Sequence, residues 1–356
     1  MNAEPSAGAR ARFGYWTPIW GGWLRNIEDE ETPATWRHIA EIARSAEASG
    51  FDLTLVPELN LNDIKGEDGP SLDAWTIATA IAAVTEKLEI IAAIRPGYYN
   101  PALIAKRSAT IADISGDRFS LNVVSAWWAE EARQYGAIFS EHDDRYQRST
   151  EFTRVLRGLW QENPFTFSGD YYDFDGTHFE PKPAALPRIY AGGESEAGRE
   201  SIAGFADAYL THGGTVEELA AKVRDLNARR ERIAGKPFDS FGMAGYAIVR
   251  DTEEEAQEEL RRITDVSEGS AGYGSYQDFI SKSQLDTEVN LRDYSVSNRG
   301  LRPEFIGTPE QVAERIHAYT RVGVEVFLLQ FSPHLAEQQR FAEQVIPLVR
   351  ELEARG

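Results

Sequence analysis

The chain has 356 residues, of which 42% are hydrophobic and 26% are charged, so it can bury the core of a large globular protein. Its formal net charge of −20 argues against nucleic acid as a partner, because binding nucleic acid requires a clustered basic surface. The absence of cysteine excludes disulfide bonds, thiolate metal sites and thiol catalysis.

The N-terminal residues contain no basic segment followed by an apolar stretch, and no apolar run approaches the roughly 18 residues of a membrane span. We therefore expect no secretion signal and no membrane partner, and we place the protein in the cytoplasm by default. A small anionic substrate is compatible with the acidic composition, because a few buried arginines can reverse the local potential.

Strands and helices alternate along the chain. Most of the predicted strands are apolar on both faces, which is typical of parallel strands covered by helices. They span residues 11–19, 52–57, 88–95, 119–125, 188–191, 208–211, 242–249 and 324–331. The helices between them span residues 35–49, 73–85, 101–114, a segment from 195, and residues 216–233, 253–263, 309–322 and 336–352. Eight such units predict a (β/α)8 TIM barrel formed by a single domain over residues 1–356.

Two segments interrupt the alternation and are interpreted as insertions in the barrel. Residues 128–186 contain a short helix at 128–135, a long helix at 144–161 and a hairpin at 165–174 with its turn at Gly169-Asp170. Residues 267–301 have little pattern and are rich in Gly, Ser and Tyr. A loop of this length inside a compact domain is usually functional or disordered.

The exit of the first strand is an unusual loop. It contains Trp16, Trp20, Trp23 and Arg25, with two glycines between the second and third tryptophans. In (β/α)8 barrels the chemistry lies where strands lead into the following loops. The tryptophans could stack on a flat ring or a sugar face while Arg25 holds an anion, or they could simply cap the barrel mouth. The sequence leaves both interpretations open.

Other strand exits also carry polar residues. Arg95 follows an apolar strand, where a structural ion pair and anion binding are equally consistent with the sequence. Asn122 lies within an apolar run and requires hydrogen-bond partners, for which a cofactor ring is a candidate. Gly192, Gly193 and Ser195 form a strand–glycine–helix junction whose backbone N–H groups can bind a phosphate.

Two histidines complete the strand exits. His212 and His334 follow the sixth and eighth strands and are candidates for the catalytic acid or base. No two of the strand-exit histidines have metal-ligand spacing together with a carboxylate, so we predict no metal site.

The sequence resembles the bacterial luciferase-like family of flavin-dependent monooxygenases along about its whole length. Within that family it is similar to the two-component enzymes that oxidise organosulfur compounds, which act on dimethylsulfone, alkanesulfonates or sulfoquinovose. The most specific pieces of the resemblance are residues 109–119, 122–125, 142–146, 191–195 and 306–309.

This resemblance implies that the chain binds reduced FMN and uses O2 as a co-substrate. The positions that match the family's flavin contacts are Glu58, Leu59, Asn122, Glu131, Arg145, Tyr146 and Ser195, and Gly193 belongs to the same phosphate junction. Asn122 is then expected near the reactive part of the ring. Arg145, Tyr146 and Ser195 are expected at the phosphate end. Arg299 matches an arginine of a mobile segment that closes over the site, and His334 also has a counterpart in the family.

The substrate half departs from the alkanesulfonate enzymes. Trp20, Ser71, His212, Ala244 and Tyr246 stand where those enzymes have other residues. We therefore predict a larger or ring-bearing organosulfonate, with a sugar sulfonate such as sulfoquinovose as the specific choice. C–S cleavage would release sulfite. The expected substrate-binding residues are Trp20, Trp23, Arg25, Arg95 and Tyr246, and Arg25, Arg95 and Arg299 are the candidates for holding the sulfonate.

The resemblance also implies partners and leaves alternatives open. The reduced flavin would come from a separate NAD(P)H-dependent reductase, and the chain would form a homodimer or homotetramer. The alternatives are a monooxygenase of another organosulfur compound such as dimethylsulfone or of a ring amide, a deazaflavin-dependent dehydrogenase, and a flavin-binding protein without activity.

Overall fold

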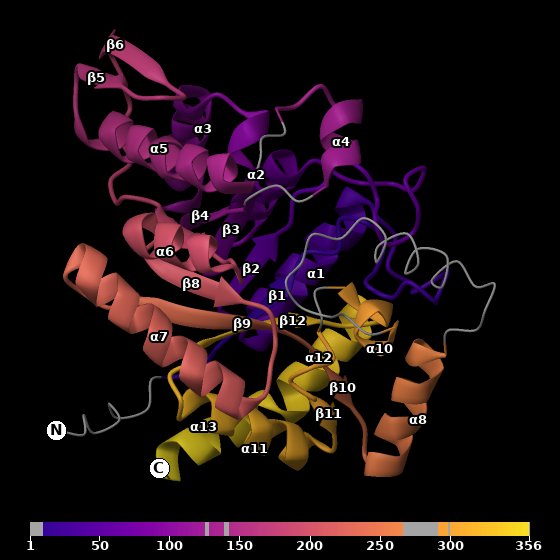
Figure 1. Cartoon of the computed structure of the whole chain (residues 1–356). Helices are drawn as coiled ribbons and strands as arrows, with labels where there is room; N and C mark the ends of the chain where they lie inside the picture. The colour runs from indigo at the N-terminus through magenta and orange to yellow at the C-terminus, as the bar shows by residue number, and fades with distance from the viewer. Residues whose placement is uncertain (1–9, 125–127, 139–141, 266–290, 298–299, 356) are drawn as a thin grey trace, which may run out of the picture.

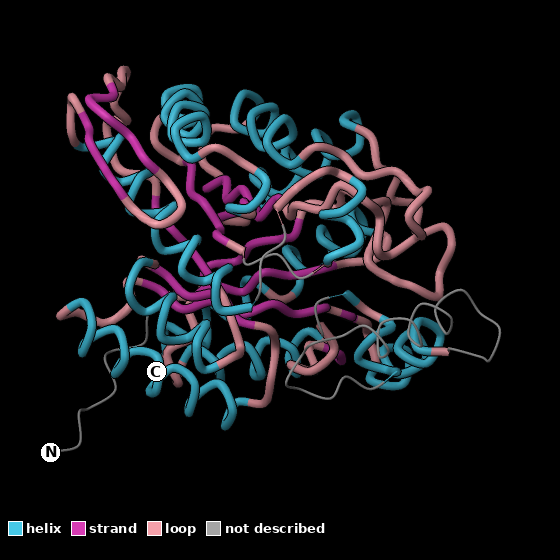
Figure 2. The backbone as a smooth tube through the Cα atoms, turned by 45° about the horizontal axis from the view of Figure 1, so that its top comes forward, coloured by secondary structure: helices cyan, strands magenta, loops and turns pink. Residues whose placement is uncertain are grey.

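The computed structural model describes residues 10–124, 128–138, 142–265, 291–297 and 300–355. Eight parallel strands form a closed barrel in the order β1-β12-β9-β8-β7-β4-β3-β2, with helices around them (Figures 1 and 2). The barrel strands are β1 (Arg12–Trp16), β2 (Leu53–Val56), β3 (Glu89–Ile94), β4 (Phe119–Val123), β7 (Arg188–Ala191), β8 (Ala208–Thr211), β9 (Ser240–Tyr246) and β12 (Val326–Gln330). The prediction of a (β/α)8 barrel is confirmed.

The remaining elements cover the barrel or extend from it. The helices are α1 (Trp36–Ser49), α2 (Ala74–Val84), the short 3-10 helix η1 (Pro96–Tyr98), α3 (Pro101–Ser115), α4 (Ala129–Gln134), α5 (His142–Gln161), α6 (Glu196–Phe205), α7 (Val216–Ala234), α8 (Glu253–Thr264), α10 (Leu291–Ser295), α11 (Pro309–Thr320), α12 (His334–Gln344) and α13 (Ile346–Arg355). Outside the barrel, β5 (Phe165–Ser168) pairs with β6 (Asp173–Thr177), and β10 (Ile248–Val249) pairs with β11 (Ile306–Gly307). The β5–β6 hairpin lies beside α5 at one end of the molecule (Figure 1).

Local sequence signals explain where several helices begin and end. The side chain of Thr35 accepts a hydrogen bond from the backbone of His38 at the start of α1, and Gly50 ends that helix in the left-handed conformation. Thr215, Thr252 and Thr308 each form a capping box at the start of α7, α8 and α11. These caps satisfy backbone N–H groups that a helix leaves without partners.

Apolar side chains fill the interior of the barrel. One cluster there consists of Leu53, Leu55, Ile91, Tyr190, Ala208, Leu210, Val326 and Leu328. A Cβ at Gly14 would lie 2.7 Å from Leu53 and 3.0 Å from Leu328, so only glycine fits between these two leucines. A larger cluster packs the outer face of the strands against the helices. The interior is therefore closed in the middle, and ligands can bind only at an end.

Polar side chains close the amino-terminal end of the barrel. The carboxylate of Glu89 accepts hydrogen bonds from Arg12 Nη2 at 2.5 Å, Ser120 Oγ at 2.7 Å and Tyr190 Oη at 3.0 Å. These partners come from β1, β4 and β7. Together with β3, which contains Glu89, the network therefore links four strands below the apolar layer.

Some predicted boundaries are wrong. The strand predicted at 242–249 is two strands, because after Tyr246 the chain leaves the barrel and Ile248 pairs with Ile306. The helix predicted at 336–352 is divided at Val345, since Pro347 has no backbone N–H to bond with the preceding turn. The hairpin turn is longer than predicted, so that the second strand begins at Asp173.

Candidate active site at the carboxyl ends of the barrel strands

Strand register brings several predicted site residues to one end of the barrel interior. Asn122 is in register with Tyr190, which faces the interior, so Asn122 faces it too, one layer nearer the carboxyl ends than Ser120. Tyr246 is in register with Gln330 on the far side of the barrel, again at the carboxyl end. His212, half-buried, directly follows β8 at the same end.

Three buried polar atoms at this end have no hydrogen-bond partner within the described residues. They are Asn122 Oδ1, Gln330 Oε1 and Trp16 Nε1. Buried polar groups in proteins are nearly always hydrogen-bonded, so such atoms indicate where a ligand or water binds. Two of the atoms are acceptors and one is a donor. Trp16 was considered only as one of the loop tryptophans, and Gln330 was not predicted, because its inward orientation follows only from strand register.

The tryptophan loop after β1 is tightly packed. Trp20 and Trp23 are 4% and 0% exposed and meet edge to face, with ring centroids 5.8 Å apart. Trp20 Nε1 donates to Ser71 Oγ at 2.9 Å. Of the two interpretations left open by the sequence, the burial favours tryptophans that close the barrel mouth. Only Trp16, which is half-buried, keeps part of its surface accessible.

A buried carboxylate fixes the path of this loop. Glu30 accepts hydrogen bonds from the backbone N–H groups of Trp23 and Leu24, at 2.9 and 2.8 Å, and from Lys65 Nζ at 2.6 Å. Gly22 has a φ of +127°, and a Cβ at this position would collide with the Glu30 carboxylate. The loop therefore requires glycine at this point.

Arg25 and Arg95, both predicted to hold a sulfonate, are engaged in ion pairs. Arg25 Nη2 bonds Asp63 Oδ2 at 2.9 Å, and its guanidinium also lies over the Tyr294 ring. Arg95 is buried between Glu58 and Glu131, with its Nε 3.1 Å from Glu58 and its Nη2 3.0 Å from Glu131. For Arg95 the structure favours the structural ion pair over anion binding.

The cluster around Arg95 holds two carboxylates against one guanidinium. Glu58 also accepts from Tyr99 Oη at 2.6 Å, and Glu131 from Tyr98 Oη at 3.2 Å and Asn60 N at 2.5 Å. Burial raises the pKa of Glu58 despite the nearby charge of Arg95. Burial alone would lower the pKa of Arg95, but the bonds and charges of Glu131 and Glu58 raise it. The cluster ties β2, β3 and α4 together beside buried Leu59.

His334 is inside the protein rather than at its surface. Its ring is fully buried against Tyr15 and Phe331, and its Nδ1 accepts from Trp23 Nε1 at 3.4 Å. Burial lowers its pKa to about 3, so the imidazole is neutral at physiological pH. These contacts are those of a residue that supports the tryptophan loop from below. The predicted role as acid or base is not supported by this placement.

The loop of Gly192, Gly193, Glu194 and Ser195 is held by its neighbours. Ser195 Oγ accepts from Gly198 N at 3.1 Å and lies 3.2 Å from Tyr146 Oη. Gly193 N donates to Tyr209 Oη at 3.2 Å, and a Cβ at Gly192 would collide with the carbonyl oxygen of Leu210. The predicted residues Tyr146, Gly193 and Ser195 therefore meet at the start of α6, and half-buried Arg145 precedes Tyr146 on α5. Arg299 is outside the described residues.

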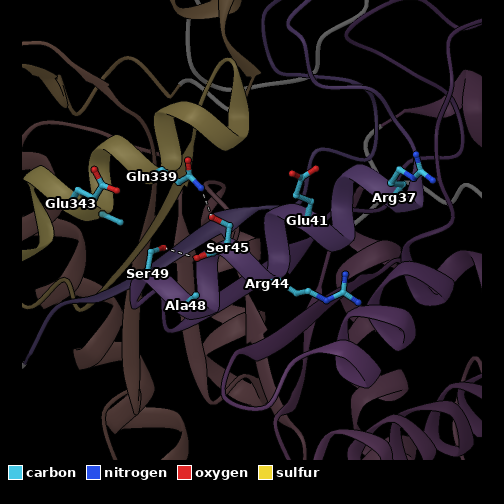
Figure 3. A pocket seen from close by; sticks show the side chains of 9 residues that line it. Arg37, Glu41, Arg44, Ser45, Ala48, Ser49, Gln339 and Glu343 are labelled. Atoms are coloured by element: carbon cyan, nitrogen blue, oxygen red, sulfur yellow. Dashed lines mark hydrogen bonds between the residues drawn. The ribbon is translucent and has the colours of Figure 1, made fainter.

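A surface groove is present elsewhere on the molecule. It lies between α1 and α12 and is lined mainly by exposed side chains such as Arg37, Arg44 and Glu343 (Figure 3). It contains none of the predicted site residues. Within the described ranges, no three His, Asp or Glu side chains are grouped to hold a metal ion, and no helix is long and apolar enough to cross a membrane.

Comparison with known proteins adds independent information. The profile of the luciferase-like monooxygenase family matches residues 12–325. The FMNH2-dependent dimethylsulfone monooxygenase of Pseudomonas fluorescens is 37% identical over 353 residues, with 97% of this chain and 96% of that protein covered. The enzyme of the same name from Pseudomonas putida is 38% identical over 352 residues and covers 96% of each chain.

Solved structures share the architecture. A long-chain alkane monooxygenase superposes with a TM-score of 0.81 at 23% identity, covering 98% of this chain and 92% of that one. DmoA from Hyphomicrobium sulfonivorans superposes with a TM-score of 0.80 at 20% identity, covering 98% and 89%. At these identities the likeness concerns the fold alone.

Proposed function

Because the chain belongs to the luciferase-like monooxygenase family, we propose that it is a monooxygenase that uses reduced FMN and O2 to oxidise a small organosulfur compound. The structural observation that carries the proposal is the set of buried, unpartnered polar atoms of Asn122, Gln330 and Trp16 at the carboxyl ends of the barrel strands. A bound flavin and its substrate would supply partners for these atoms.

The residues present fit a reduced flavin. The Asn122 amide oxygen would accept a hydrogen bond from a ring N–H, and Leu59 offers an apolar surface at the exit of β2. At the other end, Ser195, Tyr146, Arg145 and the N–H groups at the start of α6 would bind the phosphate. Glu58 and Glu131 would act indirectly, by holding Arg95 and α4 beside the ring. Reduced flavin, when bound, activates O2 for transfer of one oxygen atom.

For the substrate we propose a small neutral sulfone, such as dimethylsulfone, rather than the organosulfonate predicted from the sequence. Both curated relatives described above are named for dimethylsulfone. Arg25 and Arg95 are already paired with carboxylates, so binding a sulfonate there would require breaking buried ion pairs. A neutral sulfone needs no such cation. The buried tryptophans around Trp16 would exclude water from it.

The proposed reaction is an oxidative cleavage of a C–S bond. One oxygen atom enters a C–H bond next to the sulfone, and the second leaves as water with the two hydrogens of the reduced flavin. The product carries a hydroxyl group on the carbon next to sulfur. Its C–S bond then breaks, which gives an aldehyde and a sulfinic acid. In this step the half-buried His212 is our candidate for removing the hydroxyl proton. Tyr246 and Gln330 would shape the substrate side of the site.

The supply of reduced flavin is part of the same proposal. We expect a separate NAD(P)H-dependent reductase as a partner, a cytoplasmic location, and assembly as a homodimer or homotetramer. Arg299 is proposed to close over the substrate.

Anaerobic titration with reduced FMN and with the reduced deazaflavin cofactor tests the proposal. An oxygen pulse then follows with dimethylsulfone or a panel of sulfonates, and with detection of aldehyde, sulfinate and sulfite. We expect reduced FMN to bind and dimethylsulfone to yield aldehyde and sulfinate. Release of sulfite from a sulfonate would show that the substrate is an organosulfonate. Binding of the deazaflavin alone would show that the protein is a dehydrogenase. In Asn122→Leu we expect reduced-FMN affinity to fall about tenfold without a lower melting temperature, because the lost oxygen atom has no hydrogen-bond partner among the residues that the structure describes.

A further inference from the structure

A carboxylate lies in the loop where the proposed function places the phosphate of the cofactor. Glu194 is in the turn between Gly193 and Ser195, at the start of α6. An ionised carboxylate next to a phosphate would repel it, particularly in a partly buried site. The loop therefore binds a phosphate well only if the charge of Glu194 is compensated.

The structure contains such compensation, supplied by α7. Lys222 Nζ lies 2.8 Å from Glu194 Oε2 and 3.0 Å from Oε1. The same ammonium group donates to Thr211 Oγ1 at 2.9 Å, and that hydroxyl donates to Glu194 Oε1 at 3.1 Å. The side chains of Lys222 and Glu194 are 16% and 23% exposed, so solvent screens this pair only partly.

Among the described residues, the other cations near Glu194 are also paired with other carboxylates. Arg199 approaches Glu194 to 3.8 Å, but it is also 3.6 Å from Asp225. In the described ion-pair network of α6 and α7, four cations face four carboxylates, namely Lys222, Arg199, Arg229 and Arg232 with Glu194, Glu196, Glu200 and Asp225. Loss of Lys222 would remove from this network the cation that lies nearest to Glu194.

Several contacts that do not involve Lys222 hold the loop in place. Tyr209 bonds both the N–H and the carbonyl of Gly193, Gly192 packs on the backbone of Leu210, and Ser195 caps α6. These contacts come from β8 and from the helix itself. Removing the ammonium group is therefore expected to change the charge of the loop more than its shape.

We propose that Lys222 determines specificity for a phosphorylated flavin by neutralising Glu194, without touching the cofactor. This inference rests on the proposed function, because it concerns the same cofactor. Lys222 lies beyond the loop motif, on a different helix, and no sequence pattern connects it with Glu194. The consequence is a preference for FMN over riboflavin that depends on a residue outside the phosphate site.

The test compares binding of reduced FMN and reduced riboflavin, measured anaerobically by flavin fluorescence. In Lys222→Met we expect FMN affinity to fall about tenfold, the effect of one uncompensated nearby charge, and riboflavin affinity to stay within about twofold. The loss should shrink at high salt because screening weakens the repulsion. The double variant Lys222→Met/Glu194→Gln should bind FMN like the wild type. Lys236→Met, which removes an exposed Lys236–Asp239 pair just beyond α7, is the matched control and should change neither affinity.

Other results would overturn the inference. An equal loss of affinity for FMN and riboflavin would mean that Lys222 only maintains the loop structure. An unchanged FMN affinity, or a double variant as weak as Lys222→Met, would show that Glu194 is not the charge being neutralised. Failure of the wild type to bind reduced FMN would overturn the proposed function and this inference with it. If the wild type binds reduced FMN normally, any of the variant results above would overturn this inference alone.

Discussion

At the scale of single residues, Arg95 is the charge on which the barrel mouth depends. It is the cation shared by the buried carboxylates of Glu58 and Glu131. We expect Arg95→Met to lower the free energy of unfolding by about 3–5 kcal/mol, because two buried carboxylates would lose their partner. Urea denaturation measures this loss. Arg133→Met, which breaks an exposed pair with Glu130, is the control and should change the stability little, because solvent screens an exposed pair. Equal effects of the two changes would contradict this account of Arg95.

His334 is expected to make the protein less stable as the pH falls. Its folded-state pKa is lowered to about 3, so between the usual histidine value of about 6.5 and about 3 only the unfolded chain binds the proton. At a pH above about 6.5, His334 does not lower the free energy of unfolding. As the pH falls through it, the free energy of unfolding should decrease by about 1.4 kcal/mol per pH unit.

The change His334→Gln tests this dependence while keeping an acceptor for Trp23 Nε1. Urea unfolding at pH 7.5 and pH 5.5 should show a smaller loss of stability in the variant than in the wild type. The exposed His178 serves as a control, and His178→Gln should keep the wild-type dependence. A loss of the same size in His334→Gln and in the wild type would contradict the prediction.

The sequence identified these residues but could not assign their contacts. Arg95 was a candidate because it directly follows an apolar strand. Its partners Glu58 and Glu131 could not be identified, because they are 37 and 36 residues away in the sequence. For Arg25 and His334 the residue type suggested chemistry, while the contacts are internal. Gln330 was missed because strand register alone determines that it faces the interior. Lys222 was missed because its partner Glu194 lies in a turn 28 residues away in the sequence.

At the scale of elements, the path of the β1 exit loop depends on Gly22. Its φ of +127° disfavours any other residue, and a side chain there would also strike Glu30. Gly50 is a matched control, since it too has a positive φ, of +92°, but open space around its Cβ position. We expect Gly22→Ala to destabilise the protein by at least about 2 kcal/mol, against about 1 kcal/mol for Gly50→Ala. Thermal or urea unfolding measures both, and equal losses would mean that contact with Glu30 is unimportant.

Most elements of the barrel follow from patterns in the sequence, and the exceptions have physical causes. Apolar runs in the sequence locate every barrel strand. Capping residues mark the ends of helices, as Thr35 and Gly50 do for α1. The division of the predicted strand at 242–249 depends on its pairing with residue 306, far along the chain, and therefore cannot be read locally. The break before α13 could have been predicted, because Pro347 is visible in the sequence.

At the scale of the whole molecule, the surface of α2 and α3 is our candidate for the interface of the proposed assembly. The segment Ala74–Val84 contains no charged residue, although α2 is an outer helix of the barrel and exposes Thr76 and Ala83. The neighbouring helix is α3 (Figure 1). Its side chains Leu103 and Ile114 are 62% and 44% exposed. A helix that is apolar on all sides is normally covered, so this face suits the proposed homodimer or homotetramer.

The assembly can be tested with one substitution on this face and one elsewhere. Light scattering after size-exclusion chromatography should give a mass of two or four chains for the wild type. Leu103→Glu should shift the protein toward the monomer at micromolar concentration, because a carboxylate buried in an apolar interface costs several kcal/mol. Ile233→Glu is the control, because it introduces the same charge on a different helix, α7, at a side chain that is 40% exposed. It should leave the mass unaltered. A monomeric wild type would refute the assembly, and an assembly that tolerates Leu103→Glu would place its interface on other helices.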